Sequence, residues 1–252
     1  MTSTISDQLN ATILVAGAGK LGSRYLQGMA KCKNILDIYV LDISERSLQI
    51  AKQCWEQVFY KASYSKCDKV NESAIQHKTT FLTSFEKIPK NINIAVVATN
   101  ADVRPRVIKQ ISTKSEVSYW ILEKVLSQSV FELDEILSLT QNSKGTWTNI
   151  PRRMMEWYQQ IRKKFLTETP LTVRVSGYHW GLACNGIHYL DLVSWWTDET
   201  LIKIDVTQLD SKWIESKRKG FFEITGKITA IFSRGTILIL ESKSYGAPFT
   251  LE

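Results

Sequence analysis

The sequence predicts an α/β Rossmann dinucleotide-binding domain, followed by an α+β domain with a mainly antiparallel sheet. Three observations lead to this prediction: a glycine-rich turn after an early apolar run, strands and helices that alternate through the first half, and a strand-rich second half. The alternation is typical of a parallel sheet with right-handed crossovers. We therefore expect two domains, over residues 1–145 and 146–252.

The glycine-rich turn carries the strongest signal. An apolar run at 12–16 leads into the turn, and helix-compatible residues follow it. The turn reads Gly17-Ala-Gly19-Lys20-Leu21-Gly22. Gly17 permits a tight turn, Gly19 lets the backbone approach a pyrophosphate, and Gly22 lets helix and strand pack closely. The helix that begins here offers free N–H groups to the phosphates.

A second apolar run, at 35–41, ends in Asp42, twenty residues after Gly22. Its carboxylate can accept hydrogen bonds from the adenosine ribose hydroxyls and would repel a 2′-phosphate, so NAD is the expected cofactor. Arg46, one helical turn on, could instead meet that phosphate, which keeps NADP open. Methyltransferases that bind S-adenosylmethionine share a glycine-rich first turn and an acidic residue after the second strand. The first half of the chain alone does not exclude them.

The remaining elements follow from periodicity and from the residues that border each run. In the first domain we expect helices at 44–61, 103–114 and 129–142, strands at 79–82, 92–99 and 118–123, and a loop at 64–71. In the second domain we expect strands at 146–150, 171–178, 202–206, 221–232 and 236–241, and helices at 153–165 and 185–196.

Composition restricts the class of protein. The net charge of +7 comes from 32 basic and 25 acidic residues that form no long block, which favours a solvated basic surface over nucleic-acid binding. No apolar run approaches the roughly 18 residues of a membrane span, and residues 1–10 do not resemble a signal peptide. The four cysteines show neither paired spacing nor zinc spacing with the three histidines. Reduced thiols, a cytoplasmic location and no metal site are therefore expected.

Candidate catalytic residues stand in two places. Glu123-Lys124 directly follows an expected strand, at the carboxyl edge where open α/β folds bind ligands. A lysine there can donate a hydrogen bond to a substrate oxygen and stabilise an alkoxide, although a surface lysine paired with Glu123 is the simpler account. His188 and Asp191 share a helical face, where the histidine can transfer a proton and the carboxylate can orient its ring. A hydrogen-bonded core histidine is the simpler account there.

These motifs together resemble the glucose–fructose oxidoreductase/inositol dehydrogenase (Gfo/Idh/MocA) family, over about residues 12–197. Besides the glycine-rich turn, the resemblance rests on Ala98-Thr99-Asn100, Glu123-Lys124-Val125, Asn149-Ile-Pro-Arg152-Arg153 and Gly186-Ile-His188-Tyr-Leu-Asp191. The family usually has Glu-Lys-Pro, then an arginine-rich segment, then Asp-x-Gly-x-His on a helix. This order also argues against a methyltransferase.

The resemblance implies an NAD(P)-dependent oxidoreductase that transfers hydride between nicotinamide and a sugar, polyol or nucleotide-sugar derivative. It implies that Lys124 orients the substrate and takes part in proton transfer, and that His188 is the catalytic histidine. The other implied site residues lie along the cofactor (Thr99, Asn100 and Glu123) or along the substrate (Arg152, Arg153 and Asn185).

Two departures from the family pattern leave an alternative open. Val125 replaces the usual proline, which in the family helps to fix the lysine through a cis peptide. Cys184 stands four residues before His188, where an aspartate is common, and Asn185 is the nearest polar substitute. A non-catalytic dinucleotide- or sugar-binding protein on the same fold is therefore the alternative.

The second half carries two further expectations. The segment from Trp180 to His188 resembles a subgroup associated with bacterial surface-sugar clusters, including those that make sialic-acid-like nine-carbon sugars. The chain ends early for the family, which predicts a compact member or a truncated chain. The family's second sheet often mediates dimerisation, so we expect a homo-oligomer through this sheet or, if strands are missing, an exposed sheet edge.

Overall fold

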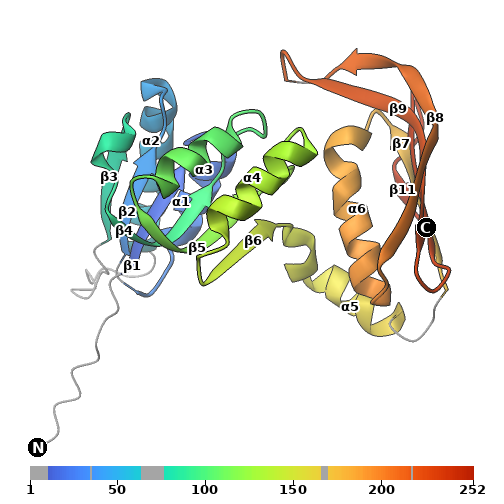
Figure 1. Cartoon of the computed structure of the whole chain (residues 1–252), viewed down its shortest axis with the longest axis horizontal. Helices are drawn as coiled ribbons and strands as arrows, with labels where there is room; N and C mark the ends of the chain where they lie inside the picture. Colours follow the sequence, from blue (N-terminus) through green and yellow to red (C-terminus); the bar gives the residue numbers. More distant parts are fainter. Residues whose placement is uncertain (1–10, 35, 64–76, 166–169, 217) are drawn as a thin grey trace, which may run out of the picture. The chain divides into compact units, whose positions relative to one another are not determined.

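The computed structural model describes residues 11–34, 36–63, 77–165, 170–216 and 218–252. The chain divides into two compact units, residues 1–149 and 150–252 (Figure 1). The loop expected at 64–71, which contains Cys67, and the first ten residues lie outside the described part of the chain. Among the described helices, none combines the length and the apolar character needed to cross a membrane.

Six parallel strands form the sheet of the first unit. They lie in the order β3-β2-β1-β4-β5-β6, which is the order of a dinucleotide-binding Rossmann sheet. The strands are β1 (Ala11–Ala16), β2 (Leu36–Leu41), β3 (Lys78–Leu82), β4 (Asn91–Val97), β5 (Glu116–Glu123) and β6 (Gly145–Asn149). The predicted α/β class is confirmed.

The last of these strands, β6, belongs to the first sheet. The sequence places a strand at 146–150 in the second domain, but residues 145–149 pair in parallel with residues 119–123 of β5. The first compact unit accordingly extends to Asn149, beyond the boundary expected after residue 145. Pairing between segments this far apart leaves no local trace in composition.

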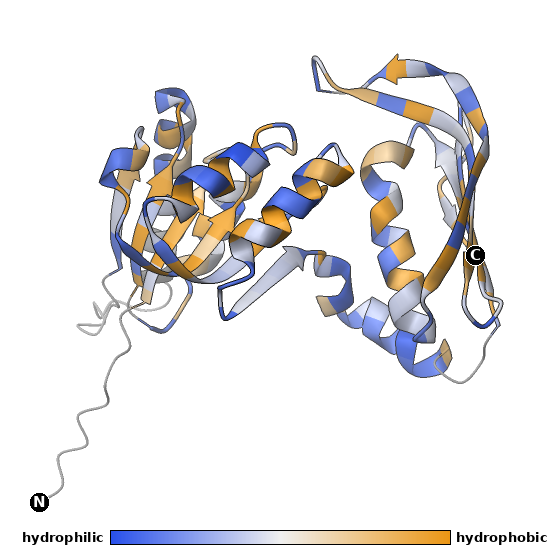
Figure 2. Ribbon diagram, in the orientation of Figure 1, coloured by the Kyte–Doolittle hydropathy of each residue, from blue (hydrophilic) through white to orange (hydrophobic). Residues whose placement is uncertain are grey.

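Helices cover both faces of the first sheet (Figure 1). They are α1 (Lys20–Met29), α2 (Glu45–Ser63), α3 (Arg104–Ser112) and α4 (Val130–Thr140). Strand β1 shows why: Ile13 and Val15 pack in the core under α1 and α2, whereas Leu14 and Ala16 pack in the core under α3 and α4. The apolar colour of the central strands in Figure 2 reflects burial on both sides.

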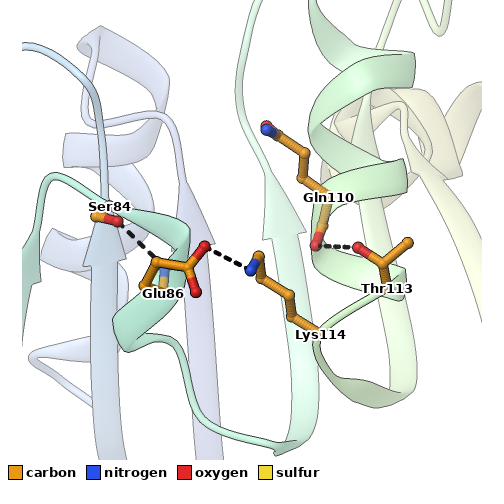
Figure 3. A network of polar contacts seen from close by, with 5 residues as sticks. All are labelled: Ser84, Glu86, Gln110, Thr113 and Lys114. Atoms are coloured by element: carbon orange, nitrogen blue, oxygen red, sulfur yellow. Dashed lines mark hydrogen bonds and ion pairs between the residues drawn. The ribbon is translucent and has the colours of Figure 1, made fainter.

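The amino edge of this sheet carries a surface ion pair (Figure 3). Lys114 follows α3, and its Nζ lies 2.6 Å from Oε1 of Glu86 in the 3-10 turn η1 (Phe85–Lys87). The hydroxyl of Ser84 accepts a hydrogen bond from the Glu86 N–H at 3.2 Å and so caps that turn. Because the pair faces solvent, it contributes little to stability.

The second unit pairs a mixed, mainly antiparallel sheet with helices, as predicted. Its strands lie in the order β11-β7-β10-β9-β8; β7 and β10 run parallel, and the other neighbours run antiparallel. The strands are β7 (Thr172–Tyr178), β8 (Leu201–Glu215), β9 (Phe222–Phe232), β10 (Ile237–Lys243) and β11 (Thr250–Leu251). Helix α6 (Leu182–Thr197) shares a buried core with these strands, and the 3-10 turn η2 (Pro151–Met154) precedes α5 (Glu156–Phe165).

Strand β8 is much longer than the 202–206 expected from its apolar residues. It pairs with β9 along its length through register shifts that start at Leu201, Asp205 and Leu209. Backbone pairing with β9 therefore holds the polar part of β8 in strand conformation, although the residues of that part do not predict a strand.

Candidate active site

The glycine turn has three different steric environments. Gly17 has a φ of +100°, and a Cβ there would lie 2.9 Å from the Ala98 carbonyl carbon. A Cβ on Gly22 would lie 1.8 Å from the Gly17 oxygen, so α1 packs tightly on the turn. A Cβ on Gly19, in contrast, would meet no atom of the described residues within 4 Å. The open space at Gly19, at the N-terminus of α1, fits a pyrophosphate.

Asp42 faces this turn from the end of β2. Its Oδ2 accepts a hydrogen bond from the Ala18 N–H at 2.7 Å, and its Oδ1 accepts one from the Ser44 N–H at 2.8 Å. A carboxylate oxygen can accept more than one hydrogen bond, so capacity remains for ribose hydroxyls. Arg46 is exposed in the first turn of α2. Lys20 and Leu21 are exposed at the start of α1.

The loop after β4 presents a hydroxyl group to which no described residue is hydrogen-bonded. Thr99 Oγ1 is buried and makes no hydrogen bond within the described residues, which fits a hydroxyl or amide of a bound ligand. Asn100, the next residue of this loop, is exposed, and its backbone carbonyl accepts a hydrogen bond from the Arg104 N–H at 3.1 Å. Since β4 lies between β1 and β5, this loop stands beside the glycine turn at the same edge of the sheet.

Glu123, at the end of β5, is a buried carboxylate with two donors. It is 4% exposed. The Tyr25 hydroxyl donates to Glu123 Oε1 at 2.7 Å, and Asn149 Nδ2 donates to the same oxygen at 2.7 Å and to the Tyr25 oxygen at 2.6 Å. Burial, followed by the hydrogen bond to this carboxylate, raises the pKa of Tyr25. Helix α1 and strand β6 therefore hold the residue that precedes Lys124.

Lys124 is half-buried, and its peptide bond to Val125 is cis although Val125 is not proline. The residues that follow are held by Arg104, which is 1% exposed. Its guanidinium donates to the carbonyl oxygens of Thr99 and Val125 and, at 3.2 Å, to that of Leu126.

Arg104 carries no predicted role in the sequence, although one signal was present. It lies in the first turn of α3, where a cation opposes the helix dipole. Burial lowers the pKa of Arg104 to about 10, while the negative charges of Glu123 and Asp102 act in the opposite direction. The side chain therefore remains charged at neutral pH.

The second unit contains the candidate histidine. His188 lies on α6 and is 8% exposed, and Cys184, one turn earlier, is exposed. Asn185 Nδ2 donates to the Trp180 carbonyl at 2.9 Å, so this amide closes the turn that begins α6. Lys124 belongs to the first unit and His188 to the second.

The two arginines of η2 contact α6 differently. Arg153 Nε donates to Asp191 Oδ2 at 2.8 Å, and its Nη2 donates to Asp191 Oδ1. Arg152 stacks over the Tyr189 ring, with its Cζ 4.3 Å from the ring centroid. The sequence indicates that Asp191 can orient His188, and the structure adds an ion pair between Asp191 and Arg153. Helical spacing does not show that an arginine from another segment reaches this carboxylate.

Solved structures share the fold of this chain, whereas no protein-family model and no curated protein matches the sequence significantly. The myo-inositol dehydrogenase of Lactobacillus casei, in complex with NAD(H) and myo-inositol, matches 96% of this chain and 71% of its own, with a TM-score of 0.67 and 15% identity. The WlbA dehydrogenase of Chromobacterium violaceum, in complex with NADH and UDP-GlcNAcA, matches 97% and 70%, with a TM-score of 0.67 and 14% identity. GenD2 from gentamicin A biosynthesis, in complex with NAD, matches 96% and 68%, with a TM-score of 0.71 and 14% identity.

The chain has the fold of these dehydrogenases. The likeness extends through both units and confirms the fold that the Gfo/Idh/MocA resemblance implies. At these identities the likeness concerns the fold, and the roles of individual site residues remain predictions.

Proposed function

We propose that this protein is an NAD-dependent oxidoreductase that acts on a CH–OH group of a sugar-like small molecule. The observation that carries the proposal is the carboxyl edge of the first sheet. There three features follow the neighbouring strands β1, β4 and β5: the open space at Gly19, the Thr99 hydroxyl that has no partner among the described residues, and Lys124. Since adjacent strands lie about 4.8 Å apart, these groups line about 10 Å of one edge. The NAD(H) in the similar structures supports this choice of cofactor.

The residues at this edge have distinct roles toward the dinucleotide, whose nicotinamide accepts or donates hydride. Gly19 and the N-terminus of α1 bind the pyrophosphate, and Asp42 accepts from the adenosine ribose hydroxyls. Thr99 Oγ1 and Asn100 contact the nicotinamide end of the dinucleotide. Asp42 favours NAD, and the exposed Arg46 is the cation that would favour NADP.

Proton handling in the proposal falls to Lys124 and His188. Lys124 donates a hydrogen bond to the substrate oxygen and stabilises its developing negative charge, and His188 takes up the hydroxyl proton during oxidation. Arg152, Arg153 and Asn185 bind polar groups of the substrate. Because Asp191 already pairs with Arg153, Arg152 is the stronger candidate: within the described residues no carboxylate pairs with it.

Turnover on a panel of inositols, sugars and nucleotide sugars, with NAD and with NADP, tests the proposal. Lys124→Ala and His188→Ala should each lower turnover by roughly 10²-fold or more, with NAD affinity nearly unchanged. The losses should be non-additive in the double variant if the two groups act as a unit. Lys87→Ala, at an exposed lysine of η1, is the matched control. Parental turnover in both single variants on a confirmed substrate would show that these residues are not catalytic.

A non-catalytic dinucleotide- or sugar-binding protein is the second candidate, favoured by the exposed Cys184 at the position of the family's aspartate. Binding of NAD without reduction on any substrate would support it. Cys184→Asp should raise turnover if the site is a weakened dehydrogenase. Nucleotide sugars and precursors of nine-carbon surface sugars belong in the panel, because a surface-sugar role is part of the proposal.

Self-association through the second sheet is also part of the proposal. Strand β8 is an edge strand and, with the start of β9, exposes several large apolar side chains: Ile202, Ile204, Val206, Trp213 and Phe222. An apolar edge of this kind favours contact with another chain. Sedimentation velocity should therefore show a homo-oligomer that Trp213→Glu, at a side chain 64% exposed, weakens. A parent that sediments as a monomer would contradict this.

A further inference from the structure

A buried arginine joins two loops at the candidate site. The Arg104 guanidinium donates to Thr99 in the loop after β4, and to Val125 and Leu126 in the loop after β5. We propose that Arg104 is a positioning residue: it ties the loop of Thr99 to the loop of Lys124 and thereby sets where Lys124 stands. Its catalytic consequence rests on the proposed function, but the coupling of the loops does not.

The chemistry of the side chain fits this role. A guanidinium is planar and presents several donors in a fixed fork, so one side chain can satisfy carbonyls that come from separate segments. Backbone carbonyls that are shielded from water and lack a donor are costly, and the Arg104 guanidinium donates to three carbonyls in part-buried surroundings. The buried carboxylate of Glu123 and the charge of Asp102 help to offset the cost of burying this cation.

Lys124 is consequently anchored on both sides along the backbone. Before it, Glu123 is held by Tyr25 and Asn149; after it, the carbonyls of residues 125 and 126 are held by Arg104. The lysine side chain itself is long and flexible. The position of its backbone therefore decides which volume the ammonium group can reach. Displacement of a catalytic group by about 1 Å can cost roughly 10²-fold in rate.

Three variants separate this role from a general effect on the fold. Arg104→Lys keeps the positive charge but loses the fork of donors, and Arg104→Met loses both. Arg106→Met is the matched control, because Arg106 lies on the same helix and is exposed. If Arg104→Met does not fold, Arg104→Lys alone carries the test.

Hydrogen exchange of the full-length protein tests the coupling directly. In Arg104→Lys, amide exchange should rise roughly tenfold or more at residues 98–101 and at residues 123–127 together, the scale of losing one hydrogen bond to a charged group. Exchange in β1 and in the second unit should remain parental, as it should everywhere in Arg106→Met. Unchanged exchange in both loops, or a uniform rise across the first unit, would overturn the proposal.

A second measurement follows Lys124 without any need for turnover. Trace acetylation with acetic anhydride across a pH series, read by mass spectrometry, reports the reactivity of each lysine. The reactivity of Lys124 should change at least about twofold in Arg104→Lys, as expected when the surroundings of an amine change, while that of Lys87 stays constant. Parental reactivity of Lys124 in a folded Arg104→Lys variant would overturn the proposal.

Kinetics on a confirmed substrate complete the test. Arg104→Lys should lower kcat by roughly tenfold or more with little change in NAD affinity, and it should cost no further activity in a Lys124→Ala background. The same fold loss in both backgrounds would show that Arg104 does not act through Lys124. If the parent turns over no substrate, the proposed function fails, whereas exchange and acetylation still decide the role of Arg104.

Discussion

Alanine placed at two glycines of the same turn should have opposite effects. At Gly22 the new Cβ would lie 1.8 Å from the Gly17 oxygen, and real Cβ atoms essentially never approach a neighbour within 3.0 Å. The obstacle is a backbone oxygen, so α1 or the turn itself must move. At Gly19 the new Cβ would meet no atom within 4 Å in the described part of the chain, and the backbone angles there, φ −68° and ψ −167°, suit alanine.

These geometries set the expected magnitudes. Overpacking typically costs about 1–3 kcal/mol, and a clash with backbone belongs at the upper end, near 3 kcal/mol. For a chain of this size, that loss at Gly22→Ala lowers Tm by roughly 6–12 °C. Gly19→Ala should leave stability unchanged or raise it by about 0.4–1 kcal/mol, because it restricts the unfolded chain. Gly19→Val should fill the space assigned to the pyrophosphate and abolish NAD binding.

Thermal unfolding followed by circular dichroism, with calorimetric titration of NAD, checks both halves of the prediction. Gly19→Val should retain the parental spectrum and Tm while losing NAD affinity. A parental Tm in Gly22→Ala would refute the packing argument. Parental NAD affinity in Gly19→Val would mean that the pyrophosphate does not bind at this turn.

Two further predictions concern charge. Asp42→Asn keeps an acceptor for the turn but removes the charge that repels a 2′-phosphate, so the preference for NAD over NADP should fall roughly tenfold in calorimetry; a parent that binds NADP more tightly than NAD would contradict this. Burial lowers the pKa of His77 below its usual 6.5, and His77 Nδ1 accepts a hydrogen bond from the Leu36 N–H at 3.2 Å. As the pH falls, His77 is therefore protonated in the unfolded chain before it is protonated in the folded protein. The stability that neutral His77 contributes is fully present above pH 6.5 and is lost as the pH falls through the lower pKa of the folded state. His77→Asn does not titrate, so its Tm should fall less on acidification than that of the parent, and an equal fall would argue against this role.

Local chemistry in the sequence was sufficient for strands β1 to β5 and for the steric environments of the glycine turn. The spacing of Gly17, Gly19 and Gly22 predicts a turn in which the outer two glycines have close backbone neighbours and the middle one is open, as the structure shows. Asp42 is predicted at the end of the second apolar strand, and in the structure its carboxylate accepts a hydrogen bond from the Ala18 N–H of that turn. The contact between Gly22 and the Gly17 oxygen lies within one turn of the chain, so residue types alone reveal it, whereas the Ala98 carbonyl beside Gly17 comes from the neighbouring strand.

Contacts between distant segments needed the tertiary structure. Strand β6 joins the first sheet by pairing with β5, and β8 extends through polar residues by pairing with β9. Arg153 takes the carboxylate of Asp191, and Arg104 joins two loops that are separated along the chain. Each of these outcomes depends on which donor or strand lies nearest in space. The pattern of one segment shows what it can pair with, but only the packed chain decides which partner it meets.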